Sequence, residues 1–281
     1  MDANDSYIVN SSGLKLYTKY WEPNEKPKAL VFISHGYAEH CQYYEPLAHV
    51  LNTIQCFAFA HDHVGHGRSE GPRVTVDAVD TYVKDVFQHT DILLQKYPNL
   101  PIFYVGHSMG GTIGIKAAMK RPNYFKGIVL IGPATCTKTK AASPFKVKLA
   151  RILGWILPSL PIVSLDFTIL TRNDDAMQVR KNDPLMWHGY ANAGWCSAMF
   201  NAIQSIENNI STVEWPFLLM HGDDDKICDI GGSKVFYEMA PSLDKTFKIY
   251  PKAYHCLLEE PEGVREQVKN DIIHWLNQRI N

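Results

Sequence analysis

The chain has 281 residues, of which 46% are hydrophobic and 20% charged, and its 28 Lys and Arg against 29 Asp and Glu give a formal net charge of −1. This composition is typical of a globular protein, excludes disorder, collagen and coiled coil, and leaves no excess of positive charge to hold nucleic acid. A chain of this length buries roughly three-quarters of its unfolded surface, so it needs neither disulfides nor a structural metal for stability.

The first 134 residues alternate between short apolar segments and longer segments with helical spacing. The earliest segment, Leu14–Trp21, alternates apolar and polar residues in the manner of an edge strand. The next apolar segments are continuous, which is typical of parallel strands buried on both faces. We expect these strands at Ala29–Ser34, Cys56–Ala60, Ile102–Val105 and Gly127–Ile131, with helices at Ala78–Lys96 and Met109–Lys120.

The alternation stops between residues 135 and 213, where three helices are expected with no strand between them. They are Pro144–Leu157, Asn173–Arg180 and Gly194–Asn208. Connections in α/β folds are normally short, so this stretch is interpreted as an inserted helical cap. Residues 1–134 and 214–281 then form the core domain. After the cap, this domain is expected to contain strands Pro216–Met220 and Thr246–Tyr250 and helices Ile230–Met239 and Glu262–Arg279. The alternation predicts a mostly parallel sheet with helices on both faces.

A Gly-x-Ser-x-Gly motif, Gly106-His107-Ser108-Met109-Gly110, lies between an expected strand and an expected helix. A serine at such a strand–turn–helix has its hydroxyl exposed at the carboxyl edge of the sheet. Glycines are expected on both sides because a Cβ there would collide as the strand and helix close over the turn. Ser108 is therefore the candidate nucleophile, and the Met109 N–H is a candidate oxyanion donor.

A serine nucleophile needs a base to take its proton and an acid to orient that base. Two strands of the C-terminal third end in such residues, one in Asp223, Asp224 and Asp225, the other in His255. The order serine, aspartate, histidine, each on a loop after a parallel strand, is that of the α/β-hydrolase fold. His255 is the expected base, and the three aspartates remain competing candidates for the acid.

Two further loops have candidate roles at the same edge of the sheet. The loop that follows Ala29–Ser34 contains Tyr37, whose N–H is the expected second oxyanion donor. The second loop contains His61, His63 and His66, a spacing that can gather a metal ion and so predicts, as a distant alternative, a metal-dependent hydrolase. Because an acidic ligand is missing at Gly65, a polar loop that braces the site is the favoured interpretation.

From about residue 5 to residue 278, the sequence motifs closely resemble those of the monoacylglycerol lipase family, least so in the cap. The matching pieces are His35-Gly36-x-x-Glu39-His40; His61-Asp62-His63-Val64-Gly65-His66-Gly67-x-Ser69-Glu70-Gly71; Gly106-His107-Ser108-Met109-Gly110-Gly111; Asp183-Pro184-Leu185; Asp225-x-x-Cys228-Asp229; and Lys248-Ile249-Tyr250-x-x-Ala253-Tyr254-His255.

The resemblance implies the α/β-hydrolase fold and a serine hydrolase that cleaves 1- and 2-monoacylglycerols to fatty acid and glycerol, without a cofactor, at membrane surfaces. It implies that Asp225 is the acid, and it supports Tyr37 and Met109 as oxyanion donors. It also implies that Glu39 binds substrate near the glycerol end and that Cys228, near the acid, reacts with thiol reagents.

Three positions depart from the family pattern, in which an Arg, a Tyr and a His stand where this chain has Tyr43, Arg180 and Leu258. Fewer partners for the glycerol hydroxyls imply looser head-group selectivity, and Arg180 raises the alternative of an anionic head group. Lysophospholipase, acyl-thioesterase and general carboxylesterase are the alternative activities on the same fold. A non-catalytic lipid-binding protein is disfavoured, because it would not need Ser108, Asp225 and His255 together.

The sequence also predicts a location for the protein. Its six cysteines contain no C-x-x-C pair, its N-terminal 15 residues are polar, and its longest apolar run, Ile152–Leu165, is too short and contains too much proline to span a bilayer. A cytoplasmic protein that associates peripherally with membranes is expected. A homodimer is one option for the oligomeric state. Contact with the membrane is assigned to the cap, where apolar residues form one helical stripe beside basic residues. The stripe consists of Phe145, Leu149, Ile152, Leu153 and Ile156.

Overall fold

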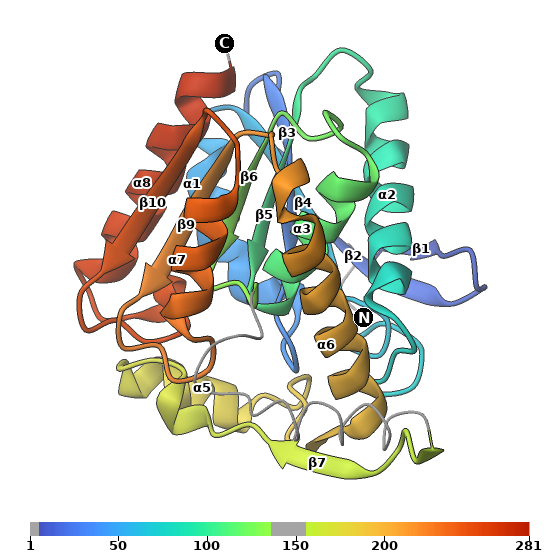
Figure 1. Ribbon diagram of the computed structural model, residues 1–281. Coiled ribbons are helices and arrows are strands. Elements are labelled where there is room, and N and C mark those ends of the chain that lie inside the picture. The colour runs from blue at the N-terminus through green and yellow to red at the C-terminus, as the bar shows by residue number, and fades with distance from the viewer. Residues whose placement is uncertain (1–5, 136–155, 281) are drawn as a thin grey trace.

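The computed structural model describes residues 6–135 and 156–280, and an eight-stranded sheet forms its centre in the order β1-β2-β4-β3-β5-β6-β9-β10 (Figure 1). The strands are β1 (Ser6–Val9), β2 (Lys15–Trp21), β3 (Ala29–Ser34), β4 (Cys56–His61), β5 (Ile102–His107), β6 (Gly127–Ile131), β9 (Phe217–Gly222) and β10 (Lys245–Tyr250). Neighbours from β4 to β10 are parallel, whereas β2 is antiparallel to β1 and β4. The predicted α/β-hydrolase fold, with its mostly parallel sheet, is thus confirmed.

The continuous apolar strands are buried on both faces of the sheet, as their sequences predict. In β3, Leu30 and Phe32 enter one hydrophobic core while Val31 and Ile33 enter the other. Side chains of α1 and α8 pack into the second core, and those of α2, α3, α6 and α7 into the first. These helices are α1 (Glu45–Asn52), α2 (Val79–Lys96), α3 (Met109–Lys120), α6 (Ala193–Asn209), α7 (Ile230–Met239) and α8 (Val264–Ile280).

Two elements of the core were not expected from the sequence, and one expectation about the sheet is wrong. β2 was expected at the edge, but β1 pairs with it and takes that place. β1 is only four residues long, which is too short for its alternation to stand out. Helix α1 has only eight residues and contains Pro46, so its pattern is equally brief, yet it buries Leu47, Ala48 and Leu51.

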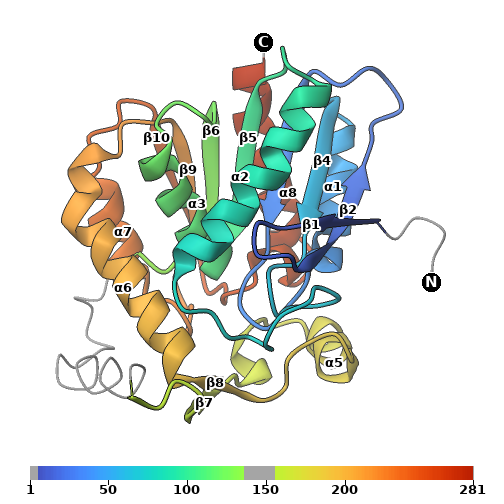
Figure 2. The ribbon, with the colours of Figure 1, turned by 90° about the vertical axis from the view of Figure 1, so that its right-hand side faces the viewer.

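The cap differs from the expected set of three helices with no strand between them. Its described part contains α5 (Asp174–Asn182), α6 and a separate antiparallel pair of strands, β7 (Pro161–Ser164) and β8 (Tyr190–Asn192). The expected helix Pro144–Leu157 lies outside the described residues except for its last two positions. In Figures 1 and 2, α5, β7 and the start of α6 lie across the carboxyl ends of the parallel strands. The division into core and cap domains at residues 134 and 214 stays a prediction.

Candidate active site

Ser108 lies at the sharp turn between β5 and α3, with φ of +53° and ψ of −116°. Backbone strain of this kind, which costs on the order of 1–3 kcal/mol, persists only where the surroundings impose it. Here two glycines let the backbone approach closely: a Cβ at Gly106 would lie 2.4 Å from the Gly110 carbonyl oxygen, and one at Gly110 would lie 2.2 Å from that of Ser34. As the sequence predicts, a side chain at either glycine would collide with the backbone.

His255 and Asp225 are joined by a short hydrogen bond from imidazole Nδ1 to carboxylate Oδ2, at 2.7 Å. The same carboxylate accepts the backbone N–H groups of Ile227 and Cys228 at 2.8 and 2.9 Å, and its Oδ2 lies 3.2 Å from His221 Nε2. Burial opposes the charge of Asp225, but the two histidines hold its pKa well below the usual range. Burial lowers the pKa of His255, so this imidazole is neutral at pH 7 and can accept a proton.

The three neighbouring aspartates lie in different surroundings, which sequence alone could not show. Asp224 pairs with Lys226 at the surface, and Asp223 accepts the backbone N–H of Lys252. Asp225 instead has a fully buried carboxylate that contacts His255. The geometry therefore favours Asp225 as the acid, in agreement with the family resemblance.

Ser108 and His255 both line a cavity of about 470 Å³ beneath the cap. The Ser108 hydroxyl contacts the Cys228 thiol, whose pKa burial raises; the bond from a catalytic serine to its histidine often tightens only when substrate binds. Tyr37 and Met109 line the same cavity, and Met109 is the first residue of α3, where the N–H has no acceptor within the helix. Apolar residues supply most of the remaining wall, including Leu165, Ile169, Leu170, Trp195, Met199, Phe200 and Ile203.

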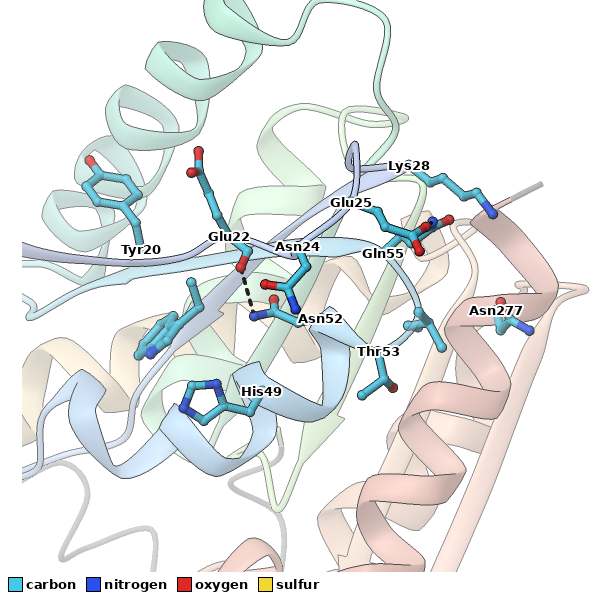
Figure 3. A pocket seen from close by; sticks show the side chains of 12 residues that line it. Tyr20, Glu22, Asn24, Glu25, Lys28, His49, Asn52, Thr53, Gln55 and Asn277 are labelled. Atoms are coloured by element: carbon cyan, nitrogen blue, oxygen red, sulfur yellow. Dashed lines mark hydrogen bonds between the residues drawn. The ribbon is translucent and has the colours of Figure 1, made fainter.

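A larger polar hollow of about 840 Å³ lies at the amino ends of β3 and β4, the opposite end of the sheet from Ser108 (Figure 3). Its labelled side chains are mostly carboxylates and amides, with hydrogen bonds from Asn52 Nδ2 to the Glu22 carbonyl at 3.2 Å and from Gln55 to the Glu25 carboxylate. None of the catalytic candidates lines it. The candidate active site is therefore the smaller, apolar cavity.

Glu39, the expected substrate-binding residue, is 2% exposed, and both of its carboxylate oxygens have protein partners. Oε1 accepts from the Gly36 N–H, the Tyr44 hydroxyl and His107 Nδ1, and Oε2 accepts from Arg180. Burial opposes ionisation of His107, but Cys256 and Glu39 raise its pKa to about 10. These contacts already engage both carboxylate oxygens. Direct binding of substrate by Glu39 stays a prediction.

Arg180 lies between two carboxylates, Glu39 and Glu259, and its guanidinium carbon is 4.4 Å from the centre of the Tyr43 ring. The positive charge that would attract an anionic head group is therefore balanced within the protein. Neither this pairing nor the charge on His107 was deduced from the sequence. The acidic pair Glu259-Glu260, shortly after His255, is the local signal in the sequence.

The histidine-rich loop forms a packed cluster. His61, His63 and His66 are buried, and burial lowers the pKa of each. Their rings pack against those of His35 and His89. Across residues 6–135 and 156–280, no group of three or more His, Cys, Asp or Glu side chains is arranged to hold a metal ion. The geometry thus gives no support to the metal-dependent alternative.

Comparison with known proteins identifies the family of this chain. The family described as Serine aminopeptidase, S33 matches residues 25–262. Monoglyceride lipase from Homo sapiens is 41% identical over 97% of this chain and 90% of its own length. In structure, the monoacylglycerol lipase of Paleococcus ferrophilus aligns with a TM-score of 0.83 and 30% identity, covering 94% of this chain and 99% of its own.

A further solved structure, a soluble variant of monoglyceride lipase from Saccharomyces cerevisiae in complex with a substrate analogue, has a TM-score of 0.86 and 25% identity over 98% of this chain and 94% of its own. These matches cover nearly the whole chain, and these three relatives are lipases by name. The protein is a serine ester hydrolase of the α/β-hydrolase fold, and it belongs to the monoglyceride lipase family.

Proposed function

We propose that this enzyme hydrolyses monoacylglycerols to a fatty acid and glycerol through an acyl intermediate on Ser108. The observation that carries the proposal is the placement of Ser108 and His255 in one apolar cavity of about 470 Å³. A cavity of this size and lining suits a single acyl chain, with a few polar groups at one end to orient the ester. Relatives named monoglyceride lipase support this substrate class.

The proposed reaction assigns one role to each residue of the site. Neutral His255 takes the Ser108 proton as the oxygen attacks the ester carbonyl, and Asp225 holds the imidazole and stabilises its charged form. The Tyr37 and Met109 N–H groups stabilise the oxyanion. His255 returns the proton to the departing glycerol oxygen, and water then repeats the cycle on the acyl enzyme. No cofactor enters any of these steps.

The cap is proposed to carry the enzyme to lipid surfaces, as a peripheral rather than a spanning contact. Within the described ranges, no helix combines the length and apolar character needed to cross a bilayer. Large apolar side chains are nevertheless exposed along one stretch of the cap, with Ile156 at 57%, Leu157 at 53% and Val163 at 54%. The other predicted stripe residues, at 145–153, lie outside the described residues. Exposed apolar side chains of this kind favour insertion into a membrane interface.

Head-group selectivity is proposed to be looser than the family pattern implies. Tyr43 donates its hydroxyl to Asp183 at 2.8 Å, Arg180 is paired with two carboxylates, and Leu258 is apolar. These side chains therefore offer few free donors to two glycerol hydroxyls. A site without such donors discriminates poorly against esters that lack the hydroxyls.

A substrate panel tests the proposal directly. The panel compares kcat/KM for 2-monoacylglycerol, the matching acyl methyl ester, lysophosphatidylcholine, acyl-CoA and a p-nitrophenyl ester, with fluorophosphonate labelling of Ser108 as the measure of active enzyme. We expect monoacylglycerol and methyl ester to be the preferred pair, within about a hundredfold of each other. Preference for lysophosphatidylcholine or acyl-CoA would replace the proposed substrate. A thousandfold preference for the glycerol ester would overturn the looser selectivity.

A further inference from the structure

The cap helix α5 is attached to the rest of the molecule in an unusual way. Of its residues, Arg180 alone is buried, with 3% exposure. Helices usually attach through an apolar face, because apolar burial is the dominant favourable term in packing. Here the buried contact is a guanidinium, the side chain best suited to hold two carboxylates in a fixed geometry.

The two carboxylates belong to two different loops of the site. Arg180 binds Glu259 through Nε at 2.6 Å and a terminal nitrogen at 2.9 Å, and Glu39 through the same terminal nitrogen at 2.7 Å. Glu259 lies four residues after His255 in the loop that carries the proposed base. Glu39 lies two residues after Tyr37, the proposed oxyanion donor, in the same loop.

Glu39 transmits the contact to the oxyanion loop itself. Its Oε1 accepts the Gly36 N–H at 2.5 Å, directly before Tyr37. Ala38, between Tyr37 and Glu39, has a positive φ of 66°, a strained conformation that the surroundings must impose. A second cap residue contributes, since the backbone N–H of Trp187 donates to the Ala38 carbonyl at 2.8 Å. The loop that presents the Tyr37 N–H is thus held by two cap residues, Arg180 through Glu39 and Trp187 directly.

Arg180 links these groups into a chain of alternating charge. Glu259, Arg180, Glu39 and His107 follow one another, and His107 immediately precedes the nucleophile. Arg180 lowers the pKa of Glu39 against the opposing effect of burial, so the carboxylate that holds Gly36 remains charged. Without Arg180, the Glu39 carboxylate would lose its partner on Oε2, and the donors to Oε1 alone would hold it beside Gly36.

We propose that Arg180 is a positioning residue for catalysis: from the cap it fixes the oxyanion loop through Glu39 and the His255 loop through Glu259. The inference rests on the proposed roles of Tyr37 and His255. It predicts that a cap residue controls the rate at which even a small ester is cleaved, although such an ester does not need the cap for binding.

The test compares Arg180→Gln with Arg172→Gln, a matched control. Arg172 also joins the cap to the core, through Glu260 at 2.6 Å, directly after Glu259, but its contacts do not include Glu39, so the comparison isolates the contact with the oxyanion loop. Both variants are assayed with p-nitrophenyl butyrate, at a temperature well below unfolding as measured by circular dichroism. Loss of one oxyanion donor costs about 10²–10³ in kcat. We expect Arg180→Gln to lower kcat about a hundredfold with KM within threefold, and Arg172→Gln to change kcat less than threefold.

Further variants test the route and guard against misfolding. Arg180→Lys keeps the charge but cannot hold two carboxylates in the same fork, so it should restore part of the lost kcat. Glu39→Gln combined with Arg180→Gln should lose little more kcat than Glu39→Gln alone, because both act on one loop. If Arg180→Gln does not fold, Arg180→Lys carries the test, and kcat equal to wild type would overturn the proposal. Equal losses in Arg180→Gln and Arg172→Gln, or a loss confined to KM, would also overturn it.

The rate of fluorophosphonate labelling at Ser108 separates this proposal from the proposed substrate. Labelling needs the nucleophile and the oxyanion hole but no glycerol ester. If the wild type labels rapidly and fails on monoacylglycerol, the substrate proposal falls while the comparison of Arg180 with Arg172 still holds. If monoacylglycerol is cleaved but both arginine variants label at the wild-type rate, the positioning role falls alone.

Discussion

Helices α3 and α5 both present a residue to the active site, but they are anchored by opposite means. α3 buries nine of its residues, among them Met109, and its first turn presses against β3 so closely that Gly110 has no room for a Cβ. α5 buries Arg180 alone and is attached through ion pairs. Close packing fixes a position in the absence of any charge, whereas the attachment of α5 depends on one guanidinium keeping its two carboxylate partners. The nucleophile turn is therefore expected to be rigid, and the cap to be the adjustable part.

The largest effect is expected when the proposed nucleophile on the rigid turn, Ser108, is removed. Ser108→Ala should lower kcat about 10⁵–10⁶-fold on any ester, since removing a triad serine is about as severe as removing the whole triad. The fold should be unaffected, because the small side chain fits the same turn. Measured kcat together with the thermal midpoint checks this. Substantial activity in the variant would show that Ser108 is not the nucleophile.

Replacing the proposed catalytic acid, Asp225, should have the next largest effect. Asp225→Asn should lower kcat by about 10⁴, because an amide holds the imidazole in the wrong tautomer. Asp224→Asn is the matched control one residue away and should stay within twofold, since Asp224 pairs with Lys226 at the surface. If Asp224→Asn is the damaging change, the assignment of the acid is wrong.

Low pH should destabilise the core of the protein, because several of its histidines are buried in the neutral form. Burial lowers the pKa of His35 to about 4 and those of His66 and His89 to about 3, against about 6.5 in an unfolded chain. Between these values and 6.5 the unfolded state binds protons that the folded state does not. The free energy of unfolding is therefore highest above pH 6.5 and falls as pH falls, by up to about 1.4 kcal/mol per pH unit for each histidine.

Urea unfolding at pH 7.5, 6.0 and 5.0 measures this dependence. Asp85, whose pKa burial raises to about 7, acts in the opposite direction but is one group against several. His66→Asn should flatten the slope with pH, while the exposed His274→Asn should leave it unchanged. An unfolding free energy that does not fall between pH 6.5 and 5.0 would contradict the buried, neutral state of the cluster.

The smallest expected effect concerns the exposed apolar side chains of the cap. Replacing Ile156, Leu157 and Ile162 by Ser should reduce vesicle binding and lower activity on dispersed lipid about tenfold, with hydrolysis of a short soluble ester unchanged. Each inserted apolar side chain contributes on the order of 1.5–3 kcal/mol to membrane binding. Leu243→Ser, a fully exposed leucine of the core domain, is the control and should change neither activity. Equal losses on both substrates would mean that the cap residues stabilise the fold instead.

The parts of the molecule that could be predicted are those fixed by near neighbours in sequence. The apolar runs around Val31 and Val105 predict strands buried on both faces, and Gly106 and Gly110 predict the turn at Ser108, because each signal lies within a few residues. The short elements β1, α1, β7 and β8 were missed since four to eight residues give too little periodicity to stand out. The resemblance to a family, not spacing, separated Asp225 from Asp223 and Asp224.

The amino-acid sequence alone predicts the fold class, the turn at Ser108 and a candidate base, His255, in the loop after the last strand. Only the tertiary structure brought Arg180 to Glu39, which is 141 residues away in the chain, and to Glu259, 79 residues away. It also buried five histidines together and turned one of the three consecutive aspartates, Asp225, toward His255. The physical reason is that local backbone geometry depends on adjacent residues, whereas the partner of a charge depends on which loops the folded sheet places at the same edge.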